Sequence, residues 1–347
     1  MTALAAYAQL IGLFDWIASY AARLAGRSRL RLFALVYVAG IGTSALLSND
    51  ATIVALTPAV ISTLRRYDTS PLPYVVACAL VANAASFVLP ISNPSNLLVF
   101  AGHMPSLGAW LGAFALPSCA AMVVTFLALW WLFRRELRGD ARCDESATAT
   151  PAPLAIAFVA AAAVVIVATS AFGGPLGAAT FACGAAAWIA ATWRRRADGA
   201  VVVRGIAWRV IALTAALFVF VSAIDDHGGF AASRAVFAWC EHLAAPWSAL
   251  ASGFAVAAAS NAINNLPVGL NLGETLPAMH AGAYLTRAAL IGVNLGPNAT
   301  VNGSLATLLW LGIVRRAGID VSGLAFARIG IAATIPALAA ALAILLP

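Results

Sequence analysis

The chain has 347 residues, of which 63% are hydrophobic and 10% are charged, and its mean hydropathy is +0.92. A soluble domain carries about 25% charged residues, so this composition excludes a water-soluble globular protein. The apolar runs are about twenty residues long, which is the length of a membrane-spanning helix, and they lack the alternating pattern of a transmembrane barrel. The predicted fold class is therefore an all-α integral membrane protein in a lipid bilayer.

The net charge of +7 does not indicate nucleic-acid binding. All twenty basic residues are Arg, and they form short clusters between apolar runs, which is typical of the cytoplasmic ends of membrane spans. The clusters are Arg27, Arg29 and Arg31; Arg65 and Arg66; Arg134, Arg135, Arg138 and Arg142; Arg194, Arg195 and Arg196; and Arg315 and Arg316. The five Cys residues are scattered without CxxC spacing, so no disulfide framework, metal site or other cofactor is predicted.

Residues 14–26 are amphipathic and suit an interfacial helix. The stretch 30–66 then has two apolar arms around the polar tip Ser48–Asp50, with Arg residues at both ends. Because Arg clusters mark the cytoplasmic side, this stretch is predicted to be a re-entrant hairpin with its tip near mid-membrane. Two ordinary spans joined by a short external turn are the alternative.

Residues 71–108 are predicted to form a broken helix, because the polar segment PISNPSN at 90–96 interrupts an apolar run. Pro90 and Pro94 each remove a helical hydrogen bond and clash with the preceding turn. Breaks at membrane depth are tolerated only where they line a cavity or are covered by protein. The run 109–133 then returns to the cytoplasm as a full span.

The polar linker 134–152 is the predicted boundary between a first repeat at 1–133, shortened at its N-terminus, and a second repeat at 153–347. A second re-entrant hairpin is predicted at 246–273 and a second broken helix at 283–314. Apolar runs at 153–172, 176–193, 205–224 and 322–346 predict four further spans.

No Arg cluster flanks the second hairpin, so it is expected to enter the membrane from outside. Every strong Arg cluster then falls on the cytoplasmic side. The two hairpins open to opposite sides, which is the orientation expected of a transporter built from inverted repeats.

Four polar islands interrupt the apolar runs, at 48–50, 90–97, 259–273 and 295–305. They contain Ser, Asn and Thr side chains, which both donate and accept hydrogen bonds, and backbone groups exposed at helix ends. Such a site suits a small, oxygen-rich solute that is neutral or weakly charged. The alternative is that these side chains only join helices by hydrogen bonds.

Asp50 is the only carboxylate in the polar islands. An acid at membrane depth is costly and is usually functional, so Asp50 is the candidate for binding a proton or Na+. It could also cap the second arm of the hairpin, because Asp is a favoured N-cap residue. An enzyme is not predicted, because the chain has no HExxH, GxSxG or GxxxxGK[ST] motif.

Four segments carry a resemblance to a known family. They are SNDATIVALTP (48–58), ASFVLPISNPSNLL (85–98), SNAINNLPVGL (260–270) and LGPNATVNGSLATLLWLGIV (295–314). With them the chain resembles, over essentially its whole length, the bacterial arsenite-efflux permeases, the membrane component of arsenical pumps, in the citrate-transporter-like ion transporter superfamily. The resemblance implies a secondary transporter of the bacterial inner membrane that exports arsenite or antimonite as the hydroxide, in exchange for protons.

The resemblance also implies that solute and coupling ion bind between the hairpin tips and the broken helices. The candidate residues in the first half are Ser48, Asn49, Asp50, Thr57, Asn83, Ser92, Asn93, Ser95 and Asn96. Those in the second half are Ser260, Asn261, Asn264, Asn265, Asn294, Asn298, Asn302, Gly303 and Ser304. No metal ligand or catalytic residue is among them.

The chain departs from the family pattern in three respects. Family members have further spans before the segment that matches residues 1–26, so a misassigned start or a shortened relative is expected. The family usually has Asp at the positions of Asn83 and Asn294, and a basic residue at the position of Asn298. These differences remove charges from the expected site and count against proton coupling.

Two other functions stay open at this point. One is a carboxylate or sodium-coupled anion transporter of the same superfamily. The other is a truncated scaffold or partner subunit that does not itself transport. The candidate partners are arsenite or antimonite, H+ or Na+, a cytoplasmic ATPase subunit and a second copy of the chain.

Overall fold

The computed structural model describes residues 1–100, 103–141, 153–206 and 230–345, with a few positions between 207 and 229. Within these residues every regular element is a helix, apart from one isolated bridge between Ser28 and Asp140. The predicted all-α class is therefore confirmed. Most of the predicted linker 134–152 and of the predicted span 205–224 lies outside the described residues.

Five helices of the described chain are long and apolar enough to cross a membrane. They are α3 (Arg29–Leu46), α8 (Leu107–Leu132), α9 (Pro153–Ala171), α10 (Leu176–Arg194) and α18 (Gly323–Ile344). The helix α6 (Leu72–Ala84) is apolar but shorter. Its residues from Tyr74 to Ala84 are buried on every side, which is why apolar side chains occupy all of its faces.

The remaining helices are mostly shorter. Before α8 come α1 (Thr2–Leu10), α2 (Leu13–Ala25), α4 (Asn49–Ala51), the π-helix η1 (Thr52–Leu56), α5 (Thr57–Leu64), the 3-10 turn η2 (Pro90–Ser92) and α7 (Pro94–Val99). After α10 come α11 (Arg196–Gly205), α13 (Ala231–Glu241), α14 (Ala245–Ile263), α15 (Asn265–Ala278), α16 (Ala283–Leu295), the 3-10 turns η3 (Gly296–Ala299) and η4 (Val301–Gly303), and α17 (Leu305–Arg316). A similar succession of interrupted helices, ending in one long helix, thus runs from α3 to α8 and from α14 to α18.

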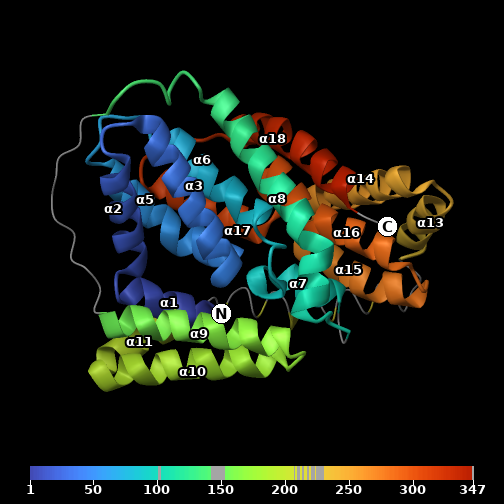
Figure 1. The fold of residues 1–347 in the computed structure, drawn as a ribbon, viewed down its shortest axis with the longest axis horizontal. Helices are drawn as coiled ribbons and strands as arrows, with labels where there is room; N and C mark the ends of the chain where they lie inside the picture. The colour runs from blue at the N-terminus through green and yellow to red at the C-terminus, as the bar shows by residue number, and fades with distance from the viewer. Residues whose placement is uncertain are drawn as a thin grey trace.

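The N-terminal helix α1 lies against α9, α10 and α11, which run alongside one another at one side of the molecule (Figure 1). Tyr7 of α1 meets Phe158 of α9 edge to face, with ring centroids 5.3 Å apart. Gly205 at the end of α11 leaves no room for a side chain beside Ala6. The helix α11 was not predicted, because its sequence RADGAVVVRG is neither a long apolar run nor a break within one.

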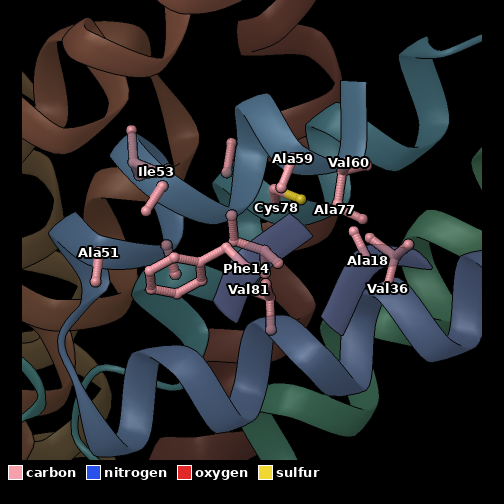
Figure 2. Close-up of a cluster of buried hydrophobic side chains, with 14 of the residues drawn as sticks. Phe14, Ala18, Val36, Ala51, Ile53, Ala59, Val60, Ala77, Cys78 and Val81 are labelled. Carbon is pink, nitrogen blue, oxygen red and sulfur yellow. The ribbon is translucent and has the colours of Figure 1, made fainter. Parts of the chain in front are cut away.

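The larger buried cluster is centred on elements of the first half of the chain and extends to α9, α10, α17 and α18. Figure 2 shows Phe14 of α2, Val36 of α3, Ile53 of η1, Val60 of α5 and Cys78 of α6 within it. All five side chains are nearly inaccessible to solvent. This packing holds the two arms of the first predicted hairpin, α3 and α5, against the enclosed helix α6.

Close helix crossings depend on small residues in the second half. A Cβ atom added at Gly292 of α16 would overlap the backbone of Gly253 in α14, and one at Gly296 would overlap Ala257. Small residues spaced four apart allow such close contact between helices in membranes. The start of η3 is thereby held directly on α14.

The prolines of the first broken helix act differently from the prediction. The helix α6 ends at Ala84, before Pro90 is reached, and Ser86 Oγ donates to the carbonyl oxygen of Asn83 over 2.7 Å at this end. Pro90 and Pro94 are the first residues of η2 and α7. Proline suits that position because its missing N–H would have no helical partner there.

Candidate functional site

Two helix breaks contain a residue that caps the following helix with its own side chain. Ser48 lies between α3 and α4, and its Oγ accepts a hydrogen bond from the backbone N–H of Ala51 over 3.2 Å. Asn264 lies between α14 and α15, and its Oδ1 accepts from the backbone N–H of Leu266 over 3.3 Å. Asn264 has φ +85° and ψ 149°, a conformation outside the left-handed helical region that residues with a side chain rarely adopt. These breaks coincide with the predicted hairpin tips.

Two further breaks end in an extended residue that caps the next helix. Asn93, with φ −146° and ψ 135°, accepts at Oδ1 from the backbone N–H of Ser95 over 3.0 Å. Ser304, with φ −141° and ψ 142°, accepts at Oγ from the backbone N–H of Ala306 over 3.2 Å. Such caps satisfy N–H groups that have no partner inside the helix. Many of the polar side chains at the breaks therefore accept hydrogen bonds from backbone N–H groups at the start of the next helix.

Asn294 of α16 is the centre of a buried hydrogen-bond network. Its Oδ1 accepts from Asn93 Nδ2 over 2.7 Å, and it shares the single hydroxyl proton of Ser86, over 2.7 Å, with the carbonyl oxygen of Asn83. Its Nδ2 donates to Asn96 Oδ1 over 2.8 Å and to the carbonyl oxygen of Leu290 over 2.9 Å. The carboxamide has two donors and two acceptor positions, so all are used. Asn294 thus joins α16 to the first broken helix and has no capacity left for a solute.

A second set of amides joins α6 to η3. Asn83 Nδ2 donates to Asn298 Oδ1 over 3.0 Å, and Asn298 Nδ2 donates to the carbonyl oxygen of Leu80 over 2.8 Å. Asn49 Nδ2 lies 3.5 Å from Asn83 Oδ1, at the limit of a hydrogen bond. These three Asn side chains are at most 2% exposed. The contact links the break between α3 and α4 to the break after α16.

The break between α14 and α15 and the break at 296–304 are also joined. Asn261 Nδ2 donates to the carbonyl oxygen of Gly296 over 2.8 Å, and its Oδ1 accepts from Thr300 Oγ1 over 2.7 Å. Asn264 Nδ2 donates to the carbonyl oxygen of Asn302 over 3.1 Å. Asn264 is half-buried and Asn302 is exposed. These two side chains therefore have atoms accessible from outside the protein.

The other candidate residues have structural neighbours. Ser92 Oγ donates to the carbonyl oxygen of Ala45 over 3.0 Å, and Thr57 Oγ1 to that of Thr52 over 3.1 Å. Asn265 is buried as the first residue of α15. A Cβ atom at Gly303 would overlap the backbone of Pro297, so glycine is required there.

Two candidate hydroxyls are buried without a hydrogen-bond partner in the described chain. They are Oγ of Ser95 in α7 and Oγ of Ser260 in α14, and both residues are 0% exposed. Ser95 faces α15. A Cβ atom added at Gly269 of α15 would lie 3.6 Å from the Cβ atom of Ser95. A buried polar group without a partner is unfavourable. Six hydroxyls outside the candidate set share this property, and Ser95 and Ser260 differ from them in lying beside the helix breaks.

Asp50 directly follows Asn49, whose side chain takes part in the amide contacts with Asn83. Ser48, and not Asp50, caps the second arm of the hairpin, so the predicted capping role of Asp50 is wrong. Asp50 follows in the first turn of α4, where a carboxylate interacts favourably with the helix N-terminus, and its backbone N–H donates to Asn49 Oδ1 over 2.9 Å. It lines a pocket of about 50 Å³ together with residues of α1.

Sequence reasoning missed Ser86 and Thr300 as members of the hydrogen-bond networks. Ser86 is in contact with Asn294, 208 positions away in the chain, and Thr300 with Asn261. Both residues lie inside or beside the polar islands, so the sequence did mark their surroundings as polar. Their partners could not be assigned from spacing, because the contacts join different helices.

The breaks present hydroxyls, carboxamides and backbone groups, with one carboxylate nearby. Among the described residues, no group of three or more His, Cys, Asp or Glu side chains could hold a metal ion. The arrangement can form hydrogen bonds to a small oxygen-rich solute. A multi-pass helical bundle with polar helix breaks enclosed in its core is the architecture of a membrane transporter.

The comparison with known proteins identifies the family. A family model described as "Citrate transporter" matches residues 1–295, and the chain belongs to this family. It is also similar to proteins named "Arsenical pump membrane protein". One from Escherichia coli is 28% identical over 352 residues, covering 96% of this chain and 81% of the relative. One from Yersinia enterocolitica is 28% identical over 351 residues, with the same coverage.

A shorter similarity points to the same location. A protein named "Inner membrane protein YbiR" from Escherichia coli K12 is 30% identical over 124 residues, which is 35% of this chain and 32% of the relative. Together with the five long apolar helices, these similarities confirm the resemblance inferred from the sequence. The protein is a multi-pass membrane transporter of the inner membrane, of the citrate-transporter and arsenical-pump type.

Proposed function

We propose that this protein is a secondary transporter that exports arsenite or antimonite across the inner membrane. The observation that carries the proposal is the chemistry of the helix breaks, which present uncharged amides and hydroxyls. Trivalent arsenite travels as a neutral hydroxide, whose groups both donate and accept hydrogen bonds as these side chains do. The similarity to arsenical pump membrane proteins over 96% of the chain supports the same assignment.

The proposed architecture is a pair of inverted repeats. The hairpins 30–66 and 246–273 would be re-entrant, and the broken helices 71–108 and 283–314 would be their partners. The recurring order of interrupted helices supports this, as do the matching caps at Asn93 and Ser304. In transporters of this kind solute binds near the bilayer midplane, where half-helices meet.

Within this site we assign two roles. Asn83, Asn294 and Asn298 hold the broken helices together, because their carboxamides are buried and bonded to other protein groups. Ser95 and Ser260 are the proposed solute contacts, because their buried hydroxyls have no partner in the described chain. The half-exposed tip at Asn264 and Asn302 would be the point of entry.

Asp50 is the proposed side chain for a coupling cation. It is the only carboxylate in the polar islands, and a charged residue at membrane depth is usually functional. A proton and Na+ are both compatible with one carboxylate. A cytoplasmic ATPase subunit and a second copy of the chain are further candidate partners.

A second candidate function is transport of a carboxylate such as citrate, which the family match favours. Against it, the residues that form the amide networks include no Arg to pair with a carboxylate. An uncharged site is better suited to a neutral solute.

The test is expression of the chain in a bacterium that lacks its own arsenite export. Growth on arsenite is expected to be restored, and Asn264→Ala and Asp50→Asn are expected to abolish it. Thr286→Ala is the matched control, since its exposed hydroxyl bonds only within its own helix, to the carbonyl oxygen of Gly282. If well-inserted protein gives no protection against arsenite but takes up labelled citrate, the arsenite proposal is wrong and the second candidate function takes its place.

A further inference from the structure

Three segments that carry Arg residues meet at the end of the bundle where α3 begins. The backbone N–H of Ala141 donates to the carbonyl oxygen of Arg27 over 2.7 Å, and that of Arg29 donates to the carbonyl oxygen of Gly139 over 3.4 Å. Arg29 Nη2 also donates to the carbonyl oxygen of Asp68 over 2.9 Å. The start of α3 is thus joined to the chain after α5 and to the chain after α8, which ends on this side of the molecule (Figure 1).

These segments form a basic surface, defined as residues 27–31, 65–68 and 138–141. They contain six Arg and two Asp residues. Arg29 holds the segments together through its bond to Asp68. Four other Arg side chains are exposed and make no ion pair or hydrogen bond within the described residues: Arg27, Arg31, Arg65 and Arg138. Their guanidinium groups are therefore available to a ligand with negative charge.

The basic surface borders exposed apolar side chains. Leu24, at the end of α2, is 55% exposed, and Leu30, between two of the Arg residues, is 40% exposed. Trp131, in the last turn of α8, is 59% exposed, and the guanidinium carbon of Arg134 lies 4.7 Å from the centre of its ring. Trp and Arg side chains together at the end of a membrane span are typical of the level of the lipid headgroups.

This combination of charge and apolar border limits the ligand. A phosphodiester carries one negative charge, and its oxygen atoms accept paired hydrogen bonds from the planar guanidinium group. A soluble acidic protein would match the charge but would leave Leu24, Leu30 and Trp131 without an apolar partner. An anionic phospholipid matches both, because its acyl chains lie directly beside its phosphate.

We propose that the basic surface binds the headgroup of an anionic phospholipid of the inner membrane. Arg27, Arg31, Arg65 and Arg138 contact the phosphate, and the leucines and Trp131 contact the upper part of the acyl chains. The bound lipid would join the start of α3, the end of α5 and the end of α8. The inference goes beyond the proposed function, because it does not depend on which solute is transported.

The experiment compares spin-labelled phosphatidylglycerol with spin-labelled phosphatidylcholine. The purified full chain is placed in phosphatidylcholine vesicles, and the fraction of each label that the protein immobilises gives their relative affinity. A preference of about fivefold or more for phosphatidylglycerol is expected, since each Arg near a phosphate adds to the attraction. Added NaCl is expected to weaken this preference, because exposed charges are screened by salt.

Two pairs of substitutions separate charge from structure. Arg27→Gln with Arg65→Gln is expected to reduce the preference to about twofold or less. Arg27→Lys with Arg65→Lys keeps both charges and is expected to keep most of the preference. Arg29 is left unchanged, because it holds the segments together.

The matched control removes the same charge elsewhere. Arg194 and Arg196 are exposed where α10 ends and α11 begins, and Arg194→Gln with Arg196→Gln is expected to leave the preference as in the wild type. An equal loss in both Gln pairs would show a general attraction and overturn the local site.

Three further outcomes would also overturn the proposal. One is the absence of any preference in monodisperse wild-type protein. Another is a loss in the Lys pair as large as in the Gln pair, which would make the effect structural. The third is binding of poly-glutamate that the Arg27 and Arg65 Gln pair abolishes while the lipid preference stays unchanged, which would assign the surface to an acidic protein.

Discussion

Asn83 of α6 donates a hydrogen bond from Nδ2 to Oδ1 of Asn298 in η3 over 3.0 Å, although 215 positions separate them in the chain. Both side chains are buried, and Asn298 donates in turn to the carbonyl oxygen of Leu80. An uncharged amide pair thus joins the enclosed helix of the first half to the break of the last interrupted helix. The following predictions test what such contacts do.

Asn298→Ala is expected to destabilise the protein by about 1–3 kcal/mol, because Asn83 Nδ2 would be left buried without a partner. Reversible unfolding in lipid or detergent measures the free energy of unfolding. The double variant with Asn83→Ala should lose less than the sum of the single variants, since both remove the same contact. Strict additivity would show that the pair does not couple the two halves.

Gly273→Ala is expected to separate α7 from α15 and to lower both stability and transport. A Cβ atom at Gly273 would overlap the carbonyl oxygen of Leu98, which is backbone and cannot turn aside. Gly112 of α8 is the matched control, because a Cβ atom there meets nothing within 4 Å. Gly112→Ala should be neutral or stabilise by up to about 1 kcal/mol through helix propensity. Equal thermal stability of the two variants would contradict the close packing of α7 on α15.

Ser95→Ala separates a solute contact from a structural hydroxyl. Its buried Oγ has no hydrogen-bond partner in the described chain, so its removal should leave the free energy of unfolding unchanged or slightly raised. Arsenite transport is expected to fall if the hydroxyl binds solute. Unchanged efflux, measured as arsenite uptake by inverted membrane vesicles, would remove Ser95 from the proposed site.

Single cysteines on a cysteine-free background test the proposed orientation. Glu136→Cys, after α8, should be protected from a membrane-impermeant maleimide in intact cells and labelled in inverted vesicles. His280→Cys, between α15 and α16, should show the reverse. Both positions lie between helices, so the reagent can reach them on their own side. Labelling of Glu136→Cys from outside would contradict the inverted repeats.

Several parts of the fold could be predicted from the sequence because they depend on local patterns. The runs at 153–172 and 176–193 are observed as α9 and α10, with bounds within a residue or two. The helix breaks at Ser48 and Asn264 could be located because polar residues within apolar runs mark the places where a helix stops. The end of α6 was placed too late, because Ser86 bonds to the carbonyl oxygen of Asn83 before any proline is reached.

The sequence by itself determined that this is a helical membrane protein with polar interruptions in its apolar runs, since hydropathy and helix-breaking residues act locally along the chain. Only the tertiary structure decided which polar groups meet. It showed that Asn294 bonds to residues of the first broken helix and that the hydroxyls of Ser95 and Ser260 have no partner among the described residues. It also placed Asp50 in a pocket with α1, next to Asn49 of the amide contacts. The physical reason is that a buried polar group takes whatever partner packing brings within about 3 Å, and contacts between distant segments leave no spacing in the sequence.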